Sequence, residues 1–299
     1  MMKKLINVIK NPKILLVKLL NCMSFLSDEV YLKIRYRLEF GKKLDLKNPQ
    51  TFNEKLNWLK INNRRPEYNK LVDKYLVRQY ISDTIGEEYL IPLLGVWNSF
   101  DEIDFNSLPE QFVLKCTHDS GSVVICKDKK TFDYNFARKK LESKMKRNLY
   151  CWGREWVYKN LTPRIIAEKY MNDGIHDDMI DYKFFCFNGN PEYIYISENL
   201  SNHKAASISF YDMSFSKAPF KRTDFKDLDY IPEKPKTFEK MIELSKTLSK
   251  EHIFLRVDFY DINEKIYFGE LTFFPAAGYL PIVPKEWDLK LGEMLNIES

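Results

Sequence analysis

Two alternating segments near the C-terminus, joined by a short polar turn, constrain the fold of this chain most strongly. In residues 253–260 apolar and polar side chains alternate, and this period of two is typical of a half-buried strand. Residues 261–265 are turn formers, and residues 266–274 resume the alternation. The pattern predicts a β-hairpin with one apolar face and one polar face.

The polar face of this predicted hairpin carries Arg256, Asp258, Glu270 and Thr272, provided that even positions lie opposite even positions. Two neighbouring carboxylates repel each other and lose hydration unless a cation compensates them. A hard divalent ion such as magnesium, shared with substrate phosphates, would do so, and an adjacent arginine can bind a transferring phosphoryl group. The alternative is a solvated face on which Arg256 pairs with Asp258 or Glu270.

Composition limits the class of protein. With 299 residues, 44% of them hydrophobic, the chain can bury one large or two medium cores. Its 47 basic and 42 acidic residues give a dispersed net charge of +5, so we expect no nucleic-acid partner, whereas anionic substrates or lipids remain compatible. The five cysteines are odd in number and widely spaced, which predicts buried, reduced thiols in a cytoplasmic protein and neither a zinc site nor a disulfide framework.

The N-terminal segment mixes lysines with leucines and isoleucines. Lys10, Lys13 and Lys18 interrupt its apolar runs, which fall short of the ~20 residues that span a bilayer. A secretory cleavage site is also missing. We therefore expect a basic amphipathic helix, which either packs on its own domain or lies peripherally on the inner face of the cell membrane.

Local signals predict the remaining elements. Thr51 to Glu54 has the pattern of a capping box at a helix start, and Asn188-Gly189 is a strong turn signal between two strands. Trp152 and Trp156 have a helical spacing that indicates core packing. The predicted helices are 28–40, 51–60, 67–81, 136–158 and 236–249, and the predicted strands, besides the C-terminal hairpin, are 89–96, the hairpin 111–127, 165–171, and the hairpin 181–197. Residues 199–235 are expected to hold strands or a lid, and residues 275–284 an irregular loop.

A lysine lies inside a strand of each of the two earlier hairpins. Lys115 precedes a loop with Ser120, Gly121 and Ser122, so its charge could lie beside phosphates while the loop offers backbone N–H groups. The alternative is a lysine on an exposed strand face. Lys183 occupies the equivalent kind of position in residues 181–187.

The order of these features resembles the ATP-grasp superfamily of carboxylate-activating ligases. The likeness is strongest to the TupA-like branch, named after teichuronopeptide biosynthesis and found in polysaccharide gene clusters. It extends over residues 49–284 and is carried by the stretches PQTFNEKLNWLK, LVDKYLVRQYI, IGEEYLIPLLGVW, FVLKCTHDSG, IIAEKYM, DYKFFCFNG and LRVDFYDINEKIYFGELTFFPAAG. The resemblance implies a mixed α/β (α+β) fold in which two α+β lobes clasp a nucleotide. The implied division is an N-terminal helical region 1–48, a pre-ATP-grasp region 49–108, a nucleotide-covering lobe 109–172 and a metal-binding and substrate lobe 173–299.

The resemblance also implies roles for individual residues, with ATP and Mg²⁺ as cofactors. Lys115 and Arg256 would act on the transferred phosphate, and Lys183 would be a second nucleotide-contacting lysine. Many ATP-grasp enzymes have asparagine where this chain has Thr272, and the loop after Lys115 has fewer glycines than usual. The implied nucleotide-binding residues are Lys115, Ser120, Gly121, Ser122, Glu168, Lys169, Tyr170, Met171 and Lys183, and the implied magnesium ligands are Asp258, Glu270 and Thr272.

The implied function is an ATP- and magnesium-dependent carboxylate–amine ligase of cell-surface polysaccharide biosynthesis. It would form an amide, through an acyl-phosphate, between a uronic acid on a free or lipid-linked glycan and an amino acid or amine. We expect residues 199–235 and 274–279 to recognise those substrates. The alternatives are a glycosyltransferase and a non-catalytic, membrane-associated adaptor. In a glycosyltransferase, aspartates can hold a metal and a sugar nucleotide. The pair Asp177-Asp178 lies in a turn-like segment, however, and is more simply explained as solvated loop charge.

Overall fold

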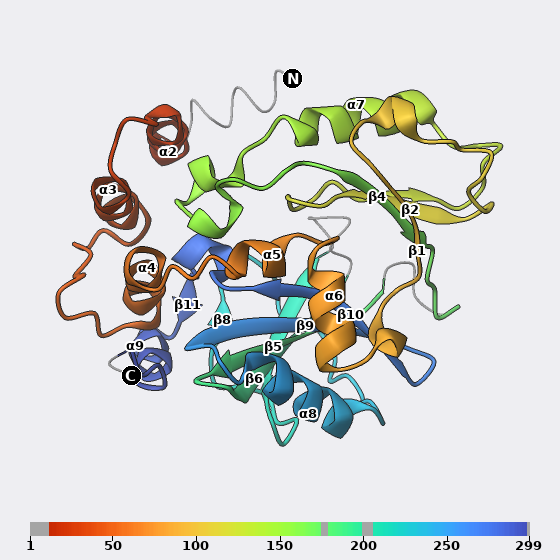
Figure 1. Cartoon of the computed structure of the whole chain (residues 1–299). Coiled ribbons are helices and arrows are strands. Elements are labelled where there is room, and N and C mark those ends of the chain that lie inside the picture. The colour runs from red at the N-terminus through yellow and green to blue at the C-terminus, as the bar shows by residue number, and fades with distance from the viewer. Residues whose placement is uncertain (1–11, 175–178, 199–205, 298–299) are drawn as a thin grey trace.

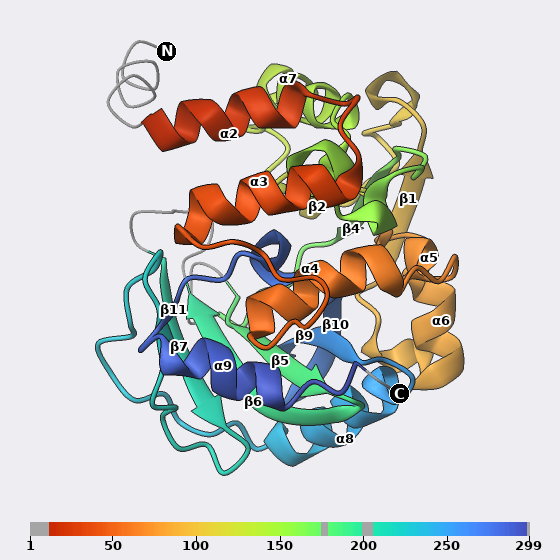
Figure 2. The same cartoon turned by 90° about the vertical axis from the view of Figure 1, so that its left-hand side faces the viewer.

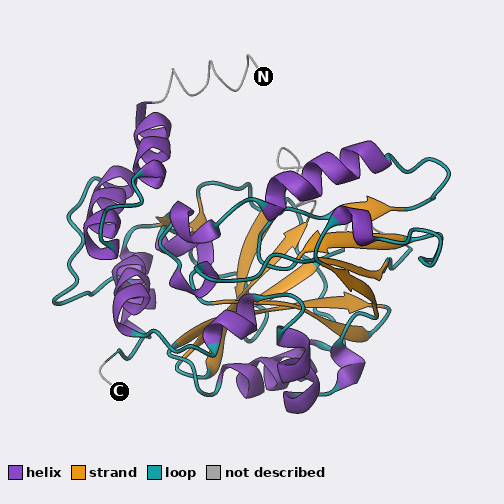
Figure 3. Ribbon diagram, turned by 45° about the horizontal axis from the view of Figure 1, so that its top comes forward, coloured by secondary structure: helices purple, strands orange, loops and turns teal. Residues whose placement is uncertain are grey.

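A computed structural model describes residues 12–174, 179–198 and 206–297. The predicted Asp177-Asp178 turn lies outside the described residues. Two antiparallel sheets form the centre of the molecule, with helices on their outer sides and an N-terminal helical region at one end (Figures 1 and 3). The mixed α+β fold expected from the sequence is confirmed. No helix of the described residues is long and apolar enough to cross a membrane.

The smaller sheet has four strands in the order β1-β4-β2-β3. Its strands are β1 (Leu93–Trp97), β2 (Phe112–Cys116), β3 (Val124–Cys126) and β4 (Ile165–Lys169). Helix α7 (Tyr134–Met145) covers the outer face, where Leu141 packs in one core cluster with Leu114 and Ala167. The predicted hairpin 111–127 is therefore present. Strand β1 is only half-buried, because it forms an edge of the sheet.

The larger sheet has five strands in the order β10-β9-β5-β6-β7. Its strands are β5 (Asp181–Phe187), β6 (Asn190–Glu198), β7 (Ser207–Asp212), β9 (Phe254–Ile262) and β10 (Lys265–Thr272). Helix α8 (Phe238–Ser249) covers its outer face, and Met241 and Leu244 share a core cluster there with Phe184, Leu255 and Val257. Both predicted hairpins of this sheet are present. At the first, Asn188 and Gly189 adopt the positive φ values that a two-residue turn needs.

In the part of the N-terminal region that the structure describes, three helices form successive layers, with α2 outermost among them (Figure 2). They are α2 (Pro12–Cys22), α3 (Asp28–Phe40) and α4 (Phe52–Asn62). The predicted capping box is present, because Thr51 accepts from the backbone of Glu54 and the Glu54 side chain accepts from the backbone of Thr51. Helix α3 ends at Gly41, whose φ is 69°.

Two of the predicted helices are shorter in the structure. The expected helix 67–81 is broken into α5 (Tyr68–Val72) and α6 (Val77–Thr84), because the Asp73 side chain accepts from the backbone N–H groups of Tyr75 and Leu76 and so starts a new helix. The expected helix 136–158 ends at Met145. It is followed by two 3₁₀ helices, η3 (Leu149–Trp152) and η4 (Trp156–Tyr158), on either side of Gly153 and of Arg154 at positive φ.

Two expectations about buried side chains were wrong in part. Trp156 is buried, but Trp152 is about half exposed, because the helix that would have aligned them ends before them. Cys116, Cys126 and Cys186 are buried, whereas Cys22 is exposed and Cys151 is half-buried. Cys22 is exposed because it ends α2, the outermost helix. All five thiols are free.

The remaining elements are short. The predicted loop 275–284 contains η5 and β11, and β11 pairs with β8 from the segment 199–235. Ala276, Ala277 and Gly278 have successive positive φ values of 50°, 53° and 71°, which is strained for the two alanines. These elements are η1 (Glu87–Tyr89), η2 (Phe100–Glu102), β8 (Lys221–Arg222), η5 (Pro275–Gly278), β11 (Ile282–Val283) and α9 (Glu286–Glu293).

Candidate active site

Strand register gathers charged side chains on the inner face of the larger sheet, opposite α8. Lys183 pairs with Asp258, and Asp258 pairs with Glu270 on the other side. Arg256 pairs with Thr272 in the same way. Residues that lie opposite each other point to the same face, so all five side chains share it.

A β-bulge at Gly269 decides this arrangement. Between the turn and Phe268 the hairpin pairs even residues with odd ones, as in Phe268 with Phe259, and the register shifts only after Phe268 so that Glu270 lies opposite Asp258. Without the bulge Glu270 would point to the apolar face. A Cβ at Gly269 would lie 3.1 Å from the Asp258 carbonyl oxygen, so a glycine fits this close approach.

The acids and cations of this face form one network. Arg256 donates from Nε to Asp258 Oδ1 at 2.7 Å and from Nη2 to Asp258 Oδ2 at 2.7 Å. Its Nη2 also donates to Glu270 Oε1 at 2.6 Å. Lys183 Nζ lies 2.7 Å from Asp258 Oδ2 and 2.9 Å from Asp181 Oδ1. Three carboxylates thus share two cations, and if all five groups are ionised the network carries one net negative charge.

Burial and neighbouring charge set the protonation of the network. Burial opposes the charged form of Lys183, but Asp181 and Asp258 outweigh it and raise the lysine pKa well above its usual value. Partial burial also opposes the charged form of Glu270, but Arg256 and Lys183 lower its pKa to about 2. Burial also opposes the charged form of Arg256, but Asp258 outweighs this effect and raises the pKa of the arginine. Glu270, Lys183 and Arg256 are therefore charged at neutral pH.

The donor set fits a magnesium ion in kind and in charge. Magnesium is commonly held by one or two carboxylates together with substrate phosphates and water. Asp258 and Glu270 are directly opposed carboxylates, and the Glu270 side chain is 41% exposed. The Asp258 side chain is 1% exposed and both of its oxygens bind cations, so Glu270 is the more accessible ligand. Thr272 Oγ1 lies 3.5 Å from Glu270 Oε1. Within the described ranges, no group of three or more His, Cys, Asp or Glu side chains is arranged to hold a metal.

The smaller sheet has its own charged cluster, on the face opposite α7. Lys115 Nζ lies 2.7 Å from Glu168 Oε2, and Arg78, from α6, reaches Glu168 Oε1 at 3.4 Å. Because α7 and α8 cover the outer faces of their sheets, the Lys115 cluster and the Lys183 cluster lie on the faces that the two sheets turn toward each other (Figure 1). The structure thus brings Lys183, Arg256, Asp258 and Glu270 together, and places Lys115 on the facing sheet.

The loop after β2, expected to cover phosphates, is held from two sides. Lys144 of α7 donates to the Ser120 carbonyl at 2.8 Å, and Lys74 donates to the Asp119 carbonyl. Ser120 and Gly121 are exposed. Ser122 is buried, and its hydroxyl accepts from the Cys116 backbone N–H at 2.8 Å. Ser120 and Gly121 can therefore reach a ligand as they stand, whereas Ser122 stabilises the loop from inside.

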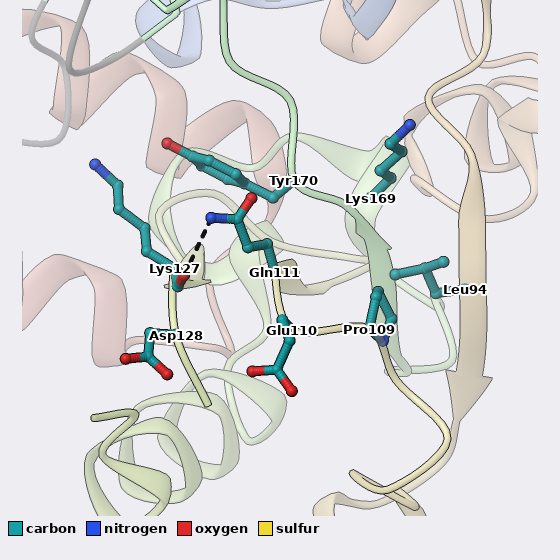
Figure 4. Close-up of a pocket in the computed structure, with 8 residues that line it drawn as sticks. All are labelled: Leu94, Pro109, Glu110, Gln111, Lys127, Asp128, Lys169 and Tyr170. Carbon is teal, nitrogen blue, oxygen red and sulfur yellow. Dashed lines mark hydrogen bonds between the residues drawn. The ribbon is translucent and has the colours of Figure 1, made fainter. Parts of the chain in front are cut away.

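The predicted adenine-binding segment divides between two surfaces. Glu168 belongs to the inner cluster, whereas Lys169 and Tyr170 line a pocket of about 650 Å³ at the end of the smaller sheet (Figure 4). In Figure 4, Tyr170 lies beside Lys127, and Lys169 points away from both. Gln111 donates to the Lys127 carbonyl at 3.1 Å across this pocket. Met171 is half-buried at the end of the segment.

Sequence reasoning missed four polar residues near the site. Asp181 completes the cluster on the larger sheet, and Arg78 completes the cluster on the smaller sheet. Only Asp181 could have been found from the sequence, because it lies two residues before Lys183 on the same strand. Lys60 is fully buried and donates to Asn57 Oδ1, Gly153 O and Ala277 O at 3.1, 2.8 and 2.5 Å. Burial lowers the pKa of Lys60 to about 7 and raises that of nearby Glu155 to about 7.

The expected role of residues 274–279 in substrate recognition needs correction. Phe274 and Tyr279 are buried in core clusters, and only Ala276 of this segment is exposed. Their aromatic rings therefore stabilise the fold and do not line a binding surface. Of the other expected segment, residues 199–205 lie outside the described part of the chain.

Comparison with known proteins gives the following. A family model described as "TupA-like ATPgrasp" matches residues 54–296. Among the solved structures that it is similar to are D-alanine–D-alanine ligase from Bacillus anthracis (14% identity, TM-score 0.43, covering 75% of this chain and 64% of that one) and from Helicobacter pylori (15%, 0.42, 77% and 59%). A third is a RimK domain ATP-grasp protein from Sphaerobacter thermophilus (10%, 0.42, 78% and 70%). This chain spans less than two thirds of the length of the two alanine ligases. No curated protein matches.

Proposed function

This chain belongs to the TupA-like ATP-grasp family, and from that premise we propose that it is an ATP- and magnesium-dependent carboxylate–amine ligase of cell-surface polysaccharide biosynthesis. In the proposed reaction an oxygen of a uronic-acid carboxylate attacks the γ-phosphorus of ATP, and the bond from that phosphorus to ADP breaks. The nitrogen of an amino acid or other amine then attacks the carbonyl carbon and loses a proton, and phosphate leaves. The product is an amide.

One observation carries this proposal. Two cations and three acids converge on the inner face of the larger sheet, opposite a cluster of two cations and one acid on the smaller sheet. A nucleotide between the sheets would meet Lys115 from one side and Lys183 and Arg256 from the other. Such an arrangement suits a reaction in which positioning and charge stabilisation do most of the work.

The proposed roles follow from the contacts of each side chain. Asp258 holds Arg256 through two hydrogen bonds, which fixes the guanidinium plane before a phosphoryl group arrives. Lys115 and Lys183 would bind phosphate oxygens, with Ser120 and Gly121 covering them. Asp258, Glu270 and Thr272 would hold magnesium, which when bound neutralises phosphate charge. Cys116 needs no part, because burial raises its thiol pKa to about 12.

The reaction can be tested with the full chain, ATP, magnesium, a uronic-acid glycan and a set of amino acids. Release of ADP and phosphate that depends on both the glycan and an amine supports the ligase. Consumption of a nucleotide sugar in a parallel assay would instead support a glycosyltransferase, and the absence of turnover with either donor would support an adaptor.

Glu270→Gln is the sharpest variant for the site, because this side chain is accessible and the change keeps its size. We expect turnover to fall at least ~10³-fold, as for the loss of one preorganised charged group at a phosphoryl-transfer site. Glu264→Gln, at the turn of the same hairpin, is the matched control and should keep full activity. Full activity of Glu270→Gln would refute the site assignment.

A further inference from the structure

Helix α2 packs against α3 along one face, and just beyond its C-terminal end Arg154 donates to the Met23 carbonyl at 2.9 Å. Lys13 pairs with Glu39 of α3 at 2.6 Å, and Asn21 accepts from the Tyr31 hydroxyl at 2.5 Å. Leu20 is the only buried residue of α2. These contacts lie along one side of the helix, at the spacing of successive turns. The other side of α2 is therefore the outer surface of the molecule, as Figure 2 shows.

That outer side is apolar. Leu15, Leu16 and Leu19 lie at i, i+1 and i+4, which places them on one stripe of the helix, and Met23 follows the last helical residue, Cys22. Each of them is between 39% and 51% exposed, and Phe25 just beyond the helix is 82% exposed. Large apolar side chains gathered in this way on a surface indicate a binding site. We call Leu15, Leu16, Leu19, Met23 and Phe25 the α2 surface.

The charge around the α2 surface decides what it can bind. The first 27 residues contain five lysines and no acidic residue, and Lys18 is exposed on α2 itself. A second copy of this chain would bring an equally positive segment against the first, and the two would repel. An apolar stripe bordered by lysines instead matches the interface of a bilayer that contains anionic lipids.

We propose that the α2 surface lies in the interfacial region of an anionic phospholipid bilayer and docks the protein there. The apolar stripe enters the boundary between headgroups and acyl chains, and Lys18, which is exposed on α2, faces the anionic headgroups. Docking leaves α3, α4 and both sheets outside the bilayer. The inference goes beyond the proposed ligase function, because it rests on the exposed face of α2 alone and is tested without nucleotide.

The test is flotation of the full chain with vesicles of phosphatidylcholine that contain about one third phosphatidylglycerol, against vesicles of phosphatidylcholine alone. We expect binding to the anionic vesicles that weakens as salt rises from roughly 0.05 to 0.5 M. The double variant Leu15→Ser, Leu19→Ser should bind at least about tenfold more weakly. Lys18→Glu should bind about fivefold more weakly.

Matched controls separate this surface from general effects. Ile231→Ser with Leu289→Ser removes two exposed apolar side chains elsewhere, and Lys246→Glu reverses an exposed charge on α8. Both control variants should keep the unfolding temperature of the wild type and should bind vesicles as the wild type does. Equal binding to both kinds of vesicle, no binding to the anionic ones, or unchanged binding of the Leu15, Leu19 variant would overturn the proposal. So would a concentration-dependent dimer in light scattering that the same double variant dissolves.

Discussion

Each of the two sheets carries a cluster of paired acids and cations on its inner face, and the two clusters differ in the sign of their net charge. On the smaller sheet a single acid, Glu168, lies between two cations, Lys115 and Arg78. On the larger sheet Asp181, Asp258 and Glu270 share two cations, Lys183 and Arg256. With every group ionised, one face has a positive surplus and the other a negative surplus. The first suits the phosphates of a nucleotide, and the second suits a divalent cation beside them.

The two clusters also differ in burial. Lys115 and Arg78 keep 16% of their side chains exposed, whereas Asp258 keeps 1% and its two cations 9% each. Water can therefore compensate the loss of a partner on the smaller sheet better than on the larger one. The larger sheet holds its charges in fixed positions, and the stability of the fold depends on their pairing.

Removal of one acid from each cluster gives the largest expected effect. Asp258→Ala leaves Arg256 and Lys183 buried with fewer partners, and we expect a loss of about 3–5 kcal/mol in the free energy of unfolding. Glu168→Ala should cost less, about 1–3 kcal/mol, because Lys115 and Arg78 keep somewhat more contact with water. Urea unfolding of both variants measures the difference. Equal losses would contradict the contrast in burial.

Acid should destabilise the protein mainly through His252, just before β9 of the larger sheet. His252 is buried against Tyr68 and Phe273, and burial together with Arg65 lowers its pKa to about 4, although Glu67 opposes the shift. The unfolded chain binds a proton near pH 6.5 and the folded chain does not. The stability is complete above pH 6.5, and up to about 3 kcal/mol is lost as the pH falls toward 4.

Replacement of this histidine tests the assignment. His252→Phe removes the titration and should flatten the pH dependence of unfolding between pH 6.5 and about 4. In the loop after β2 of the smaller sheet, burial also lowers the pKa of His118, but Asp119 opposes the shift. His118→Phe should therefore keep most of the acid sensitivity. A profile that is flattened by His118→Phe and unchanged by His252→Phe would contradict this prediction.

Nucleotide affinity should depend moderately on the smaller sheet. Lys115→Ala removes one charged donor, and we expect ATP binding to weaken about tenfold in calorimetric titration, with little change in stability. Lys139→Ala, an exposed lysine of α7 on the outer side of this sheet, is the control and should bind as the wild type does. Unchanged affinity of Lys115→Ala would assign phosphate binding to the larger sheet alone.

The smallest expected effect concerns the third magnesium ligand. Thr272→Asn restores the residue common in ATP-grasp enzymes and offers a carbonyl oxygen instead of a hydroxyl. We expect half-maximal turnover at roughly two- to fivefold lower magnesium concentration. Thr272→Ser keeps the hydroxyl and should behave as the wild type does. A large loss of activity in Thr272→Asn would mean that this position packs against the substrate and does not face the metal.

The sequence by itself determined the local elements whose signals lie within a few residues. The capping box at Thr51, the turn at Asn188-Gly189 and the strand β9 each depend on neighbours in the chain, and each is present in the structure. The half-buried strand expected from the alternation along β9 is wrong, because its polar residues Arg256 and Asp258 are buried as well. The ordered motifs also identified the family. A lysine inside a strand and two acids on a hairpin were enough to name Lys115, Lys183, Asp258 and Glu270.

Only the tertiary structure decided how these residues meet. From the sequence we expected the C-terminal turn to set the register of the hairpin. The bulge at Gly269 sets it instead, because a glycine there can approach the Asp258 backbone closely. Arg78, from the helix that follows the turn at Asp73, reaches Glu168 on a strand far along the chain. Periodicity shows which face a side chain occupies, but pairing between distant segments depends on packing and charge compensation, which no local pattern contains.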